Sequence, residues 1–444
     1  MPNIKELIKK FVKDDYFRNT VILFVFTMAT NVLQYVYKIF ANRNLSKDEY
    51  GLLGALLSLI QLIAIGSSVL KMWSTKVFSQ IHSYSNHREI GGTFRFFFLI
   101  IGGFSAILIL LFFIFLDPLM KYYKAVNIVP FIFALGILML EYIKIPFNSF
   151  LESFNIFMTR SIALFSLVAI KVVFLAVFLF IGFDLTAAMI TVLTGYIGAF
   201  LLFAVFSLPK VTKIDMTRED SPGKKITQRS FTFLYKIGIA IFFGTLLQAF
   251  DMQIARGKFE EALSGDFATA RDLGSIIYWI GTITLPLFFV SINNVMNKKQ
   301  NFLPVFLKGM GIVIVVTGAG LATFLIGIKP FVNLYNPIYL SAVDTIRYYA
   351  ISTVPYILIT FMTNFFISLD RYKVFIPLTA MVAGQIALFY FFGTNATDLI
   401  TIRFLSGLAI LLFIVIYFLV MRKKFVKTGP VELSPVPPIE EETI

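Results

Sequence analysis

Long apolar stretches alternate with short polar turns along the whole chain. Twelve stretches reach the roughly 20 residues that a helix needs to cross a bilayer. They cover residues 19–41, 50–72, 94–116, 127–150, 160–183, 185–208, 231–254, 272–295, 303–328, 341–368, 373–393 and 397–421. Because lipid offers backbone groups no hydrogen-bond partner, each stretch is expected to be helical. The pattern predicts an all-α polytopic membrane protein with about 12 transmembrane helices.

The two ends of the chain have a different pattern. Residues 1–18 place Ile4, Leu7 and Phe11 at helical spacing opposite several lysines, which predicts a cytoplasmic amphipathic helix on the membrane surface. Residues 422–444 are rich in proline and, near the end, in glutamate, so we expect a cytoplasmic disordered tail. Lys and Arg are concentrated in the loops 71–95 and 210–229 and after residue 421, which predicts that both termini are cytoplasmic.

Several polar positions recur at a nearly constant distance in the second half of the chain. Gln248 follows Gln34 by 214 positions, Gln385 follows Lys171 by 214, and Asp398 follows Asp184 by 214. The recurrence predicts two pseudo-symmetric six-helix lobes related by an axis along the membrane normal. We expect an N-terminal lobe at 19–208, a cytoplasmic inter-lobe loop at 209–229 and a C-terminal lobe at 230–421.

Composition excludes several classes of function. Hydrophobic residues make up 58% of the chain and charged residues 14%, against about 25% charged in soluble domains. The chain has no Cys and 2 His, and it lacks G-x-x-x-x-G-K-[ST], H-E-x-x-H and G-x-S-x-G motifs. We therefore expect no ATPase, no catalytic residues, no metal site and no cofactor. The formal net charge is +14, and the basic residues that produce it flank the apolar stretches. This placement indicates orientation in an anionic bilayer rather than nucleic-acid binding.

Charged residues inside apolar stretches are the candidate functional residues, because an ion costs about 2.5–3.5 kcal/mol at a helix centre. Lys171 lies halfway along the fifth stretch and is either part of a transport pathway or a packing partner of a carboxylate. Glu141 and Lys144 are three positions apart, so they share a helix face and can neutralise each other, as a structural pair or a pathway pair. Pro146 should bend that helix.

Other charges lie nearer the ends of their stretches. Lys38, Asp251 and Arg403 are candidates for the pathway, with placement at the membrane interface as the alternative. We also hypothesise a gate in which Lys38 and Asp251 pair when the protein opens inward and separate when it opens outward. Arg43, Arg256 and Lys121 are expected to be loop charges.

One short motif resembles a known family. The segment Arg43-Asn44-Leu45-Ser46-Lys47-Asp48-Glu49-Tyr50-Gly51 is similar to the R-x-L-S-x-x-E-Y-G signature of bacterial polysaccharide flippases. These proteins form a branch of the multidrug/oligosaccharidyl-lipid/polysaccharide exporter (MOP) superfamily. The resemblance implies two lobes around a central cavity, whose cations receive a diphosphate-sugar head while the polyprenyl tail stays in lipid. The cavity residues expected here are Lys38, Lys171, Gln34, Gln248 and Arg403.

Three functions remain open at this point. The first is a flippase for polyprenyl-diphosphate-linked oligosaccharide in the bacterial cytoplasmic membrane, serving cell-surface polysaccharide synthesis (O-antigen or exopolysaccharide). The second is a cation-coupled multidrug exporter, and the third a membrane glycan polymerase or ligase, although the loops expected outside are short. The expected partners of the first are the lipid-linked oligosaccharide, membrane lipids and polysaccharide polymerase or chain-length machinery. Na⁺ or H⁺ is the expected coupling ion.

Overall fold

The computed structural model describes residues 15–83, 89–154, 156–211, 224–285, 301–369 and 371–428, together with 288, 291, 292 and 295. Three predicted features lie wholly or partly outside these residues. They are the amphipathic helix as far as residue 14, the inter-lobe loop from 212 to 223, and the tail from residue 429. Within the described ranges all regular elements are helical.

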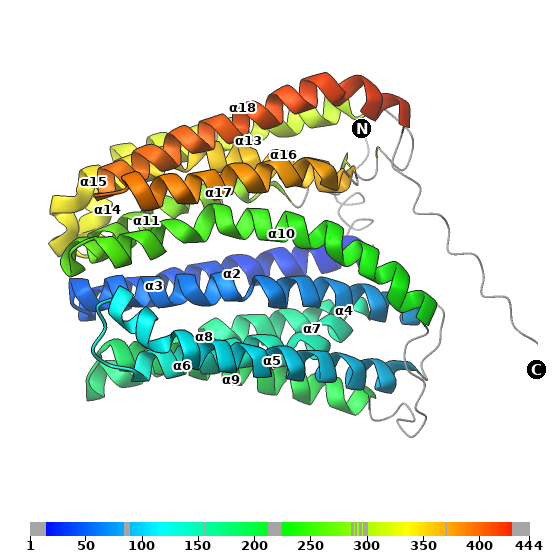
Figure 1. The fold of residues 1–444 in the computed structure, drawn as a ribbon, viewed down its shortest axis with the longest axis horizontal. Helices are drawn as coiled ribbons and strands as arrows, with labels where there is room; N and C mark the ends of the chain where they lie inside the picture. Colours follow the sequence, from blue (N-terminus) through cyan, green and yellow to red (C-terminus); the bar gives the residue numbers. More distant parts are fainter. Residues whose placement is uncertain are drawn as a thin grey trace, which may run out of the picture. The chain divides into compact units, whose positions relative to one another are not determined.

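The chain forms two compact units, whose helices are labelled in Figure 1. Unit 1 comprises Met1–Thr269 and Val332–Leu340, and unit 2 comprises Ala270–Phe331 and Ser341–Ile444. The helices of unit 1 are α2 (Asp15–Asn44), α3 (Lys47–Ile63), α4 (Ile65–Ser83), α5 (Glu89–Tyr122), α6 (Val129–Ile143), α7 (Ile145–Ser153), α8 (Phe157–Ile181), α9 (Leu185–Val211), α10 (Lys224–Lys258) and the start of α11 (Glu261–Thr282). Most of α11 belongs to unit 2, with α13 (Leu303–Ile326), α14 (Ile328–Tyr335, whose last residues belong to unit 1), η1 (Pro337–Ala342, also shared), α15 (Val343–Ser352), α16 (Val354–Ser368), η2 (Tyr372–Val374), α17 (Phe375–Phe392) and α18 (Ala396–Thr428).

The described residues contain 10 helical spans that are long and apolar enough to cross a membrane. Each coincides with one of the stretches expected from the sequence. The remaining two stretches, 19–41 and 272–295, coincide with α2 and with the second half of α11 and the partly described residues after it. The chain is therefore an all-α, multi-pass membrane protein, as the pattern predicted.

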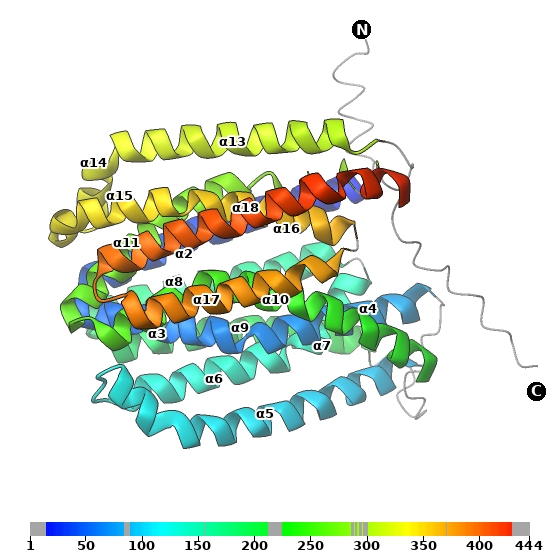
Figure 2. The ribbon, with the colours of Figure 1, turned by 45° about the horizontal axis from the view of Figure 1, so that its top comes forward.

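Three of the spans are interrupted rather than continuous. The fourth predicted stretch divides at Lys144 into α6 and α7, and Pro146 stands in the first turn of α7. Proline has no N–H for the preceding turn, so the break confirms the distortion expected from Pro146. The same arrangement recurs at Thr353 and Pro355, between α15 and α16. The break at Ala64, between the helices labelled α3 and α4 in Figure 2, has no proline.

Each unit has its own packed interior. In unit 1, α8 packs along α9 and against α2, and α10 packs against α3 and α4. Trp73, Phe78 and Phe97 belong to a buried aromatic cluster of that unit. In unit 2, α18 packs against α15, α16 and α17, and Phe306 stacks on Phe418 with ring centroids 4.6 Å apart. The lobe boundaries proposed from the repeat stay a prediction; α10 belongs to compact unit 1.

Candidate functional site

A buried cation marks the middle of helix α8. The side chain of Lys171 is only 3% exposed. Its Nζ donates a hydrogen bond to Gln34 Oε1 on α2 at 3.0 Å and lies 3.6 Å from the ring centroid of Tyr37. An amide oxygen and the negative face of an aromatic ring both stabilise a desolvated ammonium. The structure thus brings together Lys171 and Gln34, two residues singled out separately in the sequence.

The tyrosine beneath Lys171 is held by helix α9. The Tyr37 hydroxyl donates to Ala188 O at 3.1 Å and accepts from Thr191 Oγ1 at 3.1 Å. Helices α8 and α9 also approach closely at Gly195, where an added Cβ would lie 2.3 Å from Leu167 O and 3.2 Å from Lys171 Cβ. Three helices therefore fix the position of the ammonium group.

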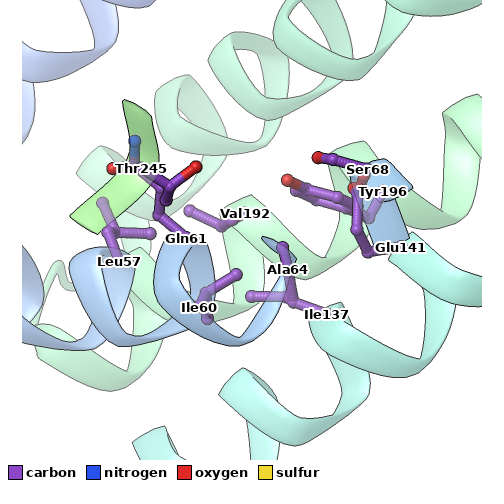
Figure 3. Close-up of a pocket in the computed structure, with 10 residues that line it drawn as sticks. All are labelled: Leu57, Ile60, Gln61, Ala64, Ser68, Ile137, Glu141, Val192, Tyr196 and Thr245. Atoms are coloured by element: carbon purple, nitrogen blue, oxygen red, sulfur yellow. The ribbon is translucent and has the colours of Figure 1, made fainter. Parts of the chain in front are cut away.

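A cavity of about 310 Å³ lies elsewhere in unit 1, lined by α3, α4, α6, α9 and α10. Figure 3 shows Gln61 and Thr245 at one end of it and Ser68, Glu141 and Tyr196 at the other, with apolar side chains between. Its full lining consists of Leu57, Ile60, Gln61, Ala64, Ser68, Ile137, Glu141, Val192, Tyr196 and Thr245. The volume is at the lower end of the roughly 300–1,000 Å³ range typical of small-molecule pockets.

The ion pair expected within the fourth predicted stretch is present. Lys144 Nζ lies 2.5 Å from Glu141 Oε2 and 4.8 Å from the ring centroid of Tyr196. The lysine side chain is 8% exposed and the glutamate 22%, so the pair is largely desolvated. Because Glu141 also lines the cavity, the pair joins the break between α6 and α7 to that cavity. Whether it serves packing or transport stays a prediction.

A second group of charges lies beyond this pair. Lys71 Nζ on α4 lies 3.0 Å from Glu152 Oε2 on α7, and Arg160 on α8 reaches the same oxygen at 3.4 Å. Arg160 Nε also donates to Asn148 Oδ1 at 2.9 Å. The charge pattern of the sequence places Lys71 in a loop and does not single out Glu152 or Arg160. One signal in the sequence could have revealed this group. Lys71 ends the second stretch, Glu152 follows the fourth and Arg160 begins the fifth, so the three opposite charges are expected on the same side of the membrane.

Unit 2 contains a buried cation of its own. The side chain of Arg403 on α18 is 4% exposed, and its guanidinium carbon lies 4.8 Å from the Tyr349 ring centroid and 4.1 Å from that of Tyr356. The Tyr356 hydroxyl donates to Arg403 O at 3.0 Å and accepts from Gln385 Nε2 at 2.7 Å. Arg403 is thus buried against protein side chains, and its depth in the membrane stays a prediction.

The remaining site candidates lie on α2 and α10. Lys38 is partly buried, with its Nζ 5.5 Å from the ring centroid of Tyr35. Gln248 is partly buried on α10. Asp251, 2% exposed on the same helix, accepts a hydrogen bond from the backbone N–H of Met252, and its depth in the membrane stays a prediction. The proposed pairing of Lys38 with Asp251 stays a prediction.

The signature segment has a structural role at the turn between α2 and α3. Ser46 and Glu49 form a reciprocal capping box at the start of α3, and Arg43 donates to Leu334 O and Tyr335 O at the end of α14. Gly51 allows close packing, since an added Cβ would lie 2.3 Å from Ser264 Oγ and 2.9 Å from Gly265 N. The signature residues thus tie the turn to two distant segments of unit 1.

Arg256 is not a loop charge, contrary to the expectation from the sequence. It lies in the last turn of α10 with 1% of its side chain exposed. It contacts Asp48 Oδ1 at 2.5 Å and donates to Tyr123 O at 2.9 Å and to Ser264 Oγ at 3.0 Å. Arg43 and Lys121 also lie in last helical turns rather than in loops.

Burial raises the pKa of Tyr123, which therefore stays protonated and donates to Gln253.

Several solved transporter structures share the fold of this chain. No model of a protein family and no curated protein sequence matches the chain. An inward-facing multidrug resistance MATE family transporter of the MOP superfamily superposes with a TM-score of 0.75 at 12% identity, covering 89% of this chain and 96% of that one. An outward-facing MATE family transporter gives 0.63 at 13% identity, covering 94% and 98%. The lipid II flippase MurJ in an inward closed conformation gives 0.68 at 12% identity, covering 89% and 87%.

Proposed function

We propose that this chain, which has the fold of the MOP superfamily, is a flippase for polyprenyl-diphosphate-linked oligosaccharide. It would move this lipid across the bacterial cytoplasmic membrane for cell-surface polysaccharide synthesis, by alternating access and without an ATPase of its own. Lys171 carries the proposal. A lysine kept in the middle of a spanning helix, at an insertion cost of about 2.5–3.5 kcal/mol, favours an anionic head group as the ligand.

A second candidate function is multidrug export, and it has its own supporting observation. The cavity combines a carboxylate, Glu141, with the aromatic ring of Tyr196. A carboxylate beside a ring face is the environment that an organic cation prefers. MATE transporters and a lipid II flippase both have this fold, so the substrate must be decided by experiment.

Reconstitution separates the two candidates. Purified protein in liposomes is supplied with a fluorescent polyprenyl-diphosphate glycan or with a fluorescent organic cation, and leaflet accessibility or uptake is followed. We expect flipping of the glycan lipid, loss of flipping in Lys171→Gln and partial retention in Lys171→Arg. Lys308→Gln, at an exposed lysine of α13, is the matched control. Wild-type flipping by Lys171→Gln at equal protein level would exclude Lys171 as the head-group cation, and cation uptake without glycan flipping would favour multidrug export.

The energy source can be tested in the same liposomes. Because the chain lacks a nucleotide-binding motif, we expect flipping without nucleotide, supported by an Na⁺ or H⁺ gradient or by membrane potential. A potential of 100 mV supplies about 2.3 kcal/mol per charge moved. Flipping that demands ATP, and that no gradient replaces, would contradict this part of the proposal.

The proposal includes a gate formed by Lys38 and Asp251. The chain has no Cys, so Gln248→Cys introduces a single labelling site on α10. We expect Lys38→Ala and Asp251→Ala each to raise labelling from the outer side, and the double variant to raise it no further. Such pairs have coupling energies of about 0.5–3 kcal/mol. Additive effects, or unchanged labelling, would show that the two charges act separately.

A further inference from the structure

The break between α3 and α4 needs a cause other than proline. A side chain that inserts into the backbone hydrogen-bond ladder is one such cause. The ladder of α3 ends with the bond from Ala64 N–H to Ile60 O at 2.8 Å, and that of α4 begins with the bond from Ser68 N–H to Ala64 O at 3.1 Å. A continuous α-helix would also pair Ser67 N–H with Ile63 O. This pair lies within the interruption.

A tyrosine hydroxyl from α6 occupies the interruption. The Tyr142 hydroxyl donates to Ile63 O at 2.8 Å and accepts a hydrogen bond from the backbone N–H of Ser67. One oxygen atom therefore joins the two backbone groups. This bridge matters because the break lies inside a span that is apolar enough to cross a membrane, where lipid offers a freed backbone group no other partner.

The surroundings of the hydroxyl fit this role. Gly66 leaves room for it, since an added Cβ would lie 2.6 Å from the Tyr142 hydroxyl oxygen. The Tyr142 ring is fully buried and lies against Phe104, with the ring centroids 5.1 Å apart. Ser67 Oγ donates to Ala64 O at 2.8 Å, which gives this carbonyl at the break a further partner. Packing thus fixes the ring, and the ring directs the hydroxyl into the helix.

The same break forms part of the cavity wall. Ala64 and Ser68 line the cavity from the α3–α4 span, and Glu141 lines it from α6 (Figure 3). Glu141 directly precedes Tyr142, so neighbouring residues of α6 serve the cavity and the break. A change in the direction of the α3–α4 span at Ala64 therefore moves part of the wall relative to Glu141.

We propose that Tyr142 is a positioning residue for this cavity: its hydroxyl replaces one backbone hydrogen bond and keeps the span bent, with Ala64 and Ser68 on the cavity wall. This role goes beyond the proposed function and is the same for either candidate substrate. Without the hydroxyl, Ser67 N–H can bond Ile63 O directly, so the span straightens and the cavity changes shape. If the hydroxyl served stability alone, its removal would leave a buried carbonyl without a partner and lower Tm.

Two variants remove the bridge in different ways. Tyr142→Phe deletes the hydroxyl and keeps the ring, whereas Gly66→Ala places a methyl group where the hydroxyl lies. The matched controls are Tyr348→Phe, at an exposed tyrosine of α15, and Gly102→Ala on α5, where an added Cβ meets nothing within 4 Å. The double variant of Tyr142→Phe and Gly66→Ala tests whether the two changes act at one place.

Three measurements on the full-length protein follow the consequences. Cryo-electron microscopy in nanodiscs shows the path of the span, and thermal unfolding gives Tm. Transport in liposomes gives KM and Vmax for the fluorescent glycan lipid or the fluorescent organic cation, whichever the wild type moves. We expect Tyr142→Phe to have a continuous helix through Ala64, an unchanged or higher Tm, and a KM raised at least fivefold with little change in Vmax. Gly66→Ala should straighten the span and raise KM too, the double variant should do no more, and both controls should match the wild type.

Several results would overturn the positioning role. A break that persists at Ala64 in Tyr142→Phe would show that the hydroxyl does not cause it. A lower Tm with wild-type KM would assign the hydroxyl to stability alone, and a straight span with wild-type KM would separate the break from the cavity. Additive rises in KM in the double variant would show that Tyr142 and Gly66 act independently. Transport of neither probe by the wild type would refute the proposed function, whereas the path of the span and the Tm of Tyr142→Phe would still decide the role of the hydroxyl.

Discussion

Units 1 and 2 each contain a buried cation, Lys171 and Arg403, that contacts tyrosine, but the two arrangements differ. In unit 1, Lys171 hydrogen-bonds Gln34 directly and faces one ring. In unit 2, Arg403 contacts two rings, and the glutamine, Gln385, bonds the tyrosine hydroxyl. We expect the Lys171 ammonium to exchange its amide partner for a ligand, and the Arg403 guanidinium between two rings to contribute to packing. We therefore expect Lys171 to serve transport and Arg403 to serve stability.

The predicted repeat makes this contrast sharper. Gln385 occupies the position 214 residues after Lys171, and Met189 the position 214 residues before Arg403. If the halves are repeats, each has kept a buried cation while changing the helix that carries it. The helix arrangement shared by the two halves would then have arisen before the present positions of their buried cations.

The largest expected difference is between Lys171→Gln and Arg403→Gln. Lys171→Gln should reduce flipping at least tenfold with little change in Tm. Arg403→Gln should lower the free energy of unfolding by about 2 kcal/mol, the scale of a desolvated cation–π contact, and keep flipping per folded molecule. Flipping normalised to folded protein, with thermal unfolding of each variant, measures both. A reversed pattern would assign transport to unit 2.

A smaller difference is expected between the two tyrosine hydroxyls. Tyr356→Phe removes the acceptor of Gln385 Nε2 inside unit 2, and a buried donor without its acceptor costs about 1–3 kcal/mol. Tyr37→Phe should cost only about 1 kcal/mol, because the Thr191 hydroxyl can donate its proton to Ala188 O, 2.7 Å away, instead of to Tyr37. Chemical or thermal unfolding of the two variants ranks them. Equal losses would show that the hydroxyl networks are equivalent.

The smallest expected effect on stability comes from substitution of a glycine near the buried cation of each unit, namely Gly384 in unit 2 and Gly195 in unit 1. Gly384, next to Gln385 on α17, has nothing within 4 Å of an added Cβ, so Gly384→Ala should stabilise the helix by about 0.5–1 kcal/mol. Gly195→Ala has the opposite sign, because its Cβ would meet Leu167 O at 2.3 Å. A fall in Tm for Gly384→Ala would show that α17 has a neighbour at this face.

The sequence predicted the helices well because a bilayer imposes a length and a polarity that few other environments require. The break at Lys144 was also predictable, from Pro146, whereas the break at Ala64 carries no such signal. Lys171 and Gln34 could each be recognised as polar residues in lipid. Their contact could not, since 137 positions separate them and no periodicity encodes which helices become neighbours.

The charged group of Lys71, Glu152 and Arg160 was missed for a different physical reason. Charges at segment ends are ordinarily solvated, so Lys71, Glu152 and Arg160 resemble loop residues in a hydrophobicity profile. Tertiary packing of α4, α7 and α8 converts them into a partly desolvated group. Similarly, Arg256 resembled a loop charge because the polar partners that bury it, Asp48 and Tyr123, come from other turns.

The turn between α2 and α3 has a consequence for how the protein is made. The Tyr50 hydroxyl hydrogen-bonds that of Tyr335, 285 positions later, so unit 1 lacks one of its own segments until that part of the chain is synthesised. At about 5–20 residues per second, the early hairpin waits roughly 15–60 s for this partner. During this interval Arg43 also lacks its acceptors, Leu334 O and Tyr335 O. Completion of unit 1 is therefore a late event in biogenesis, although most of its helices are inserted first.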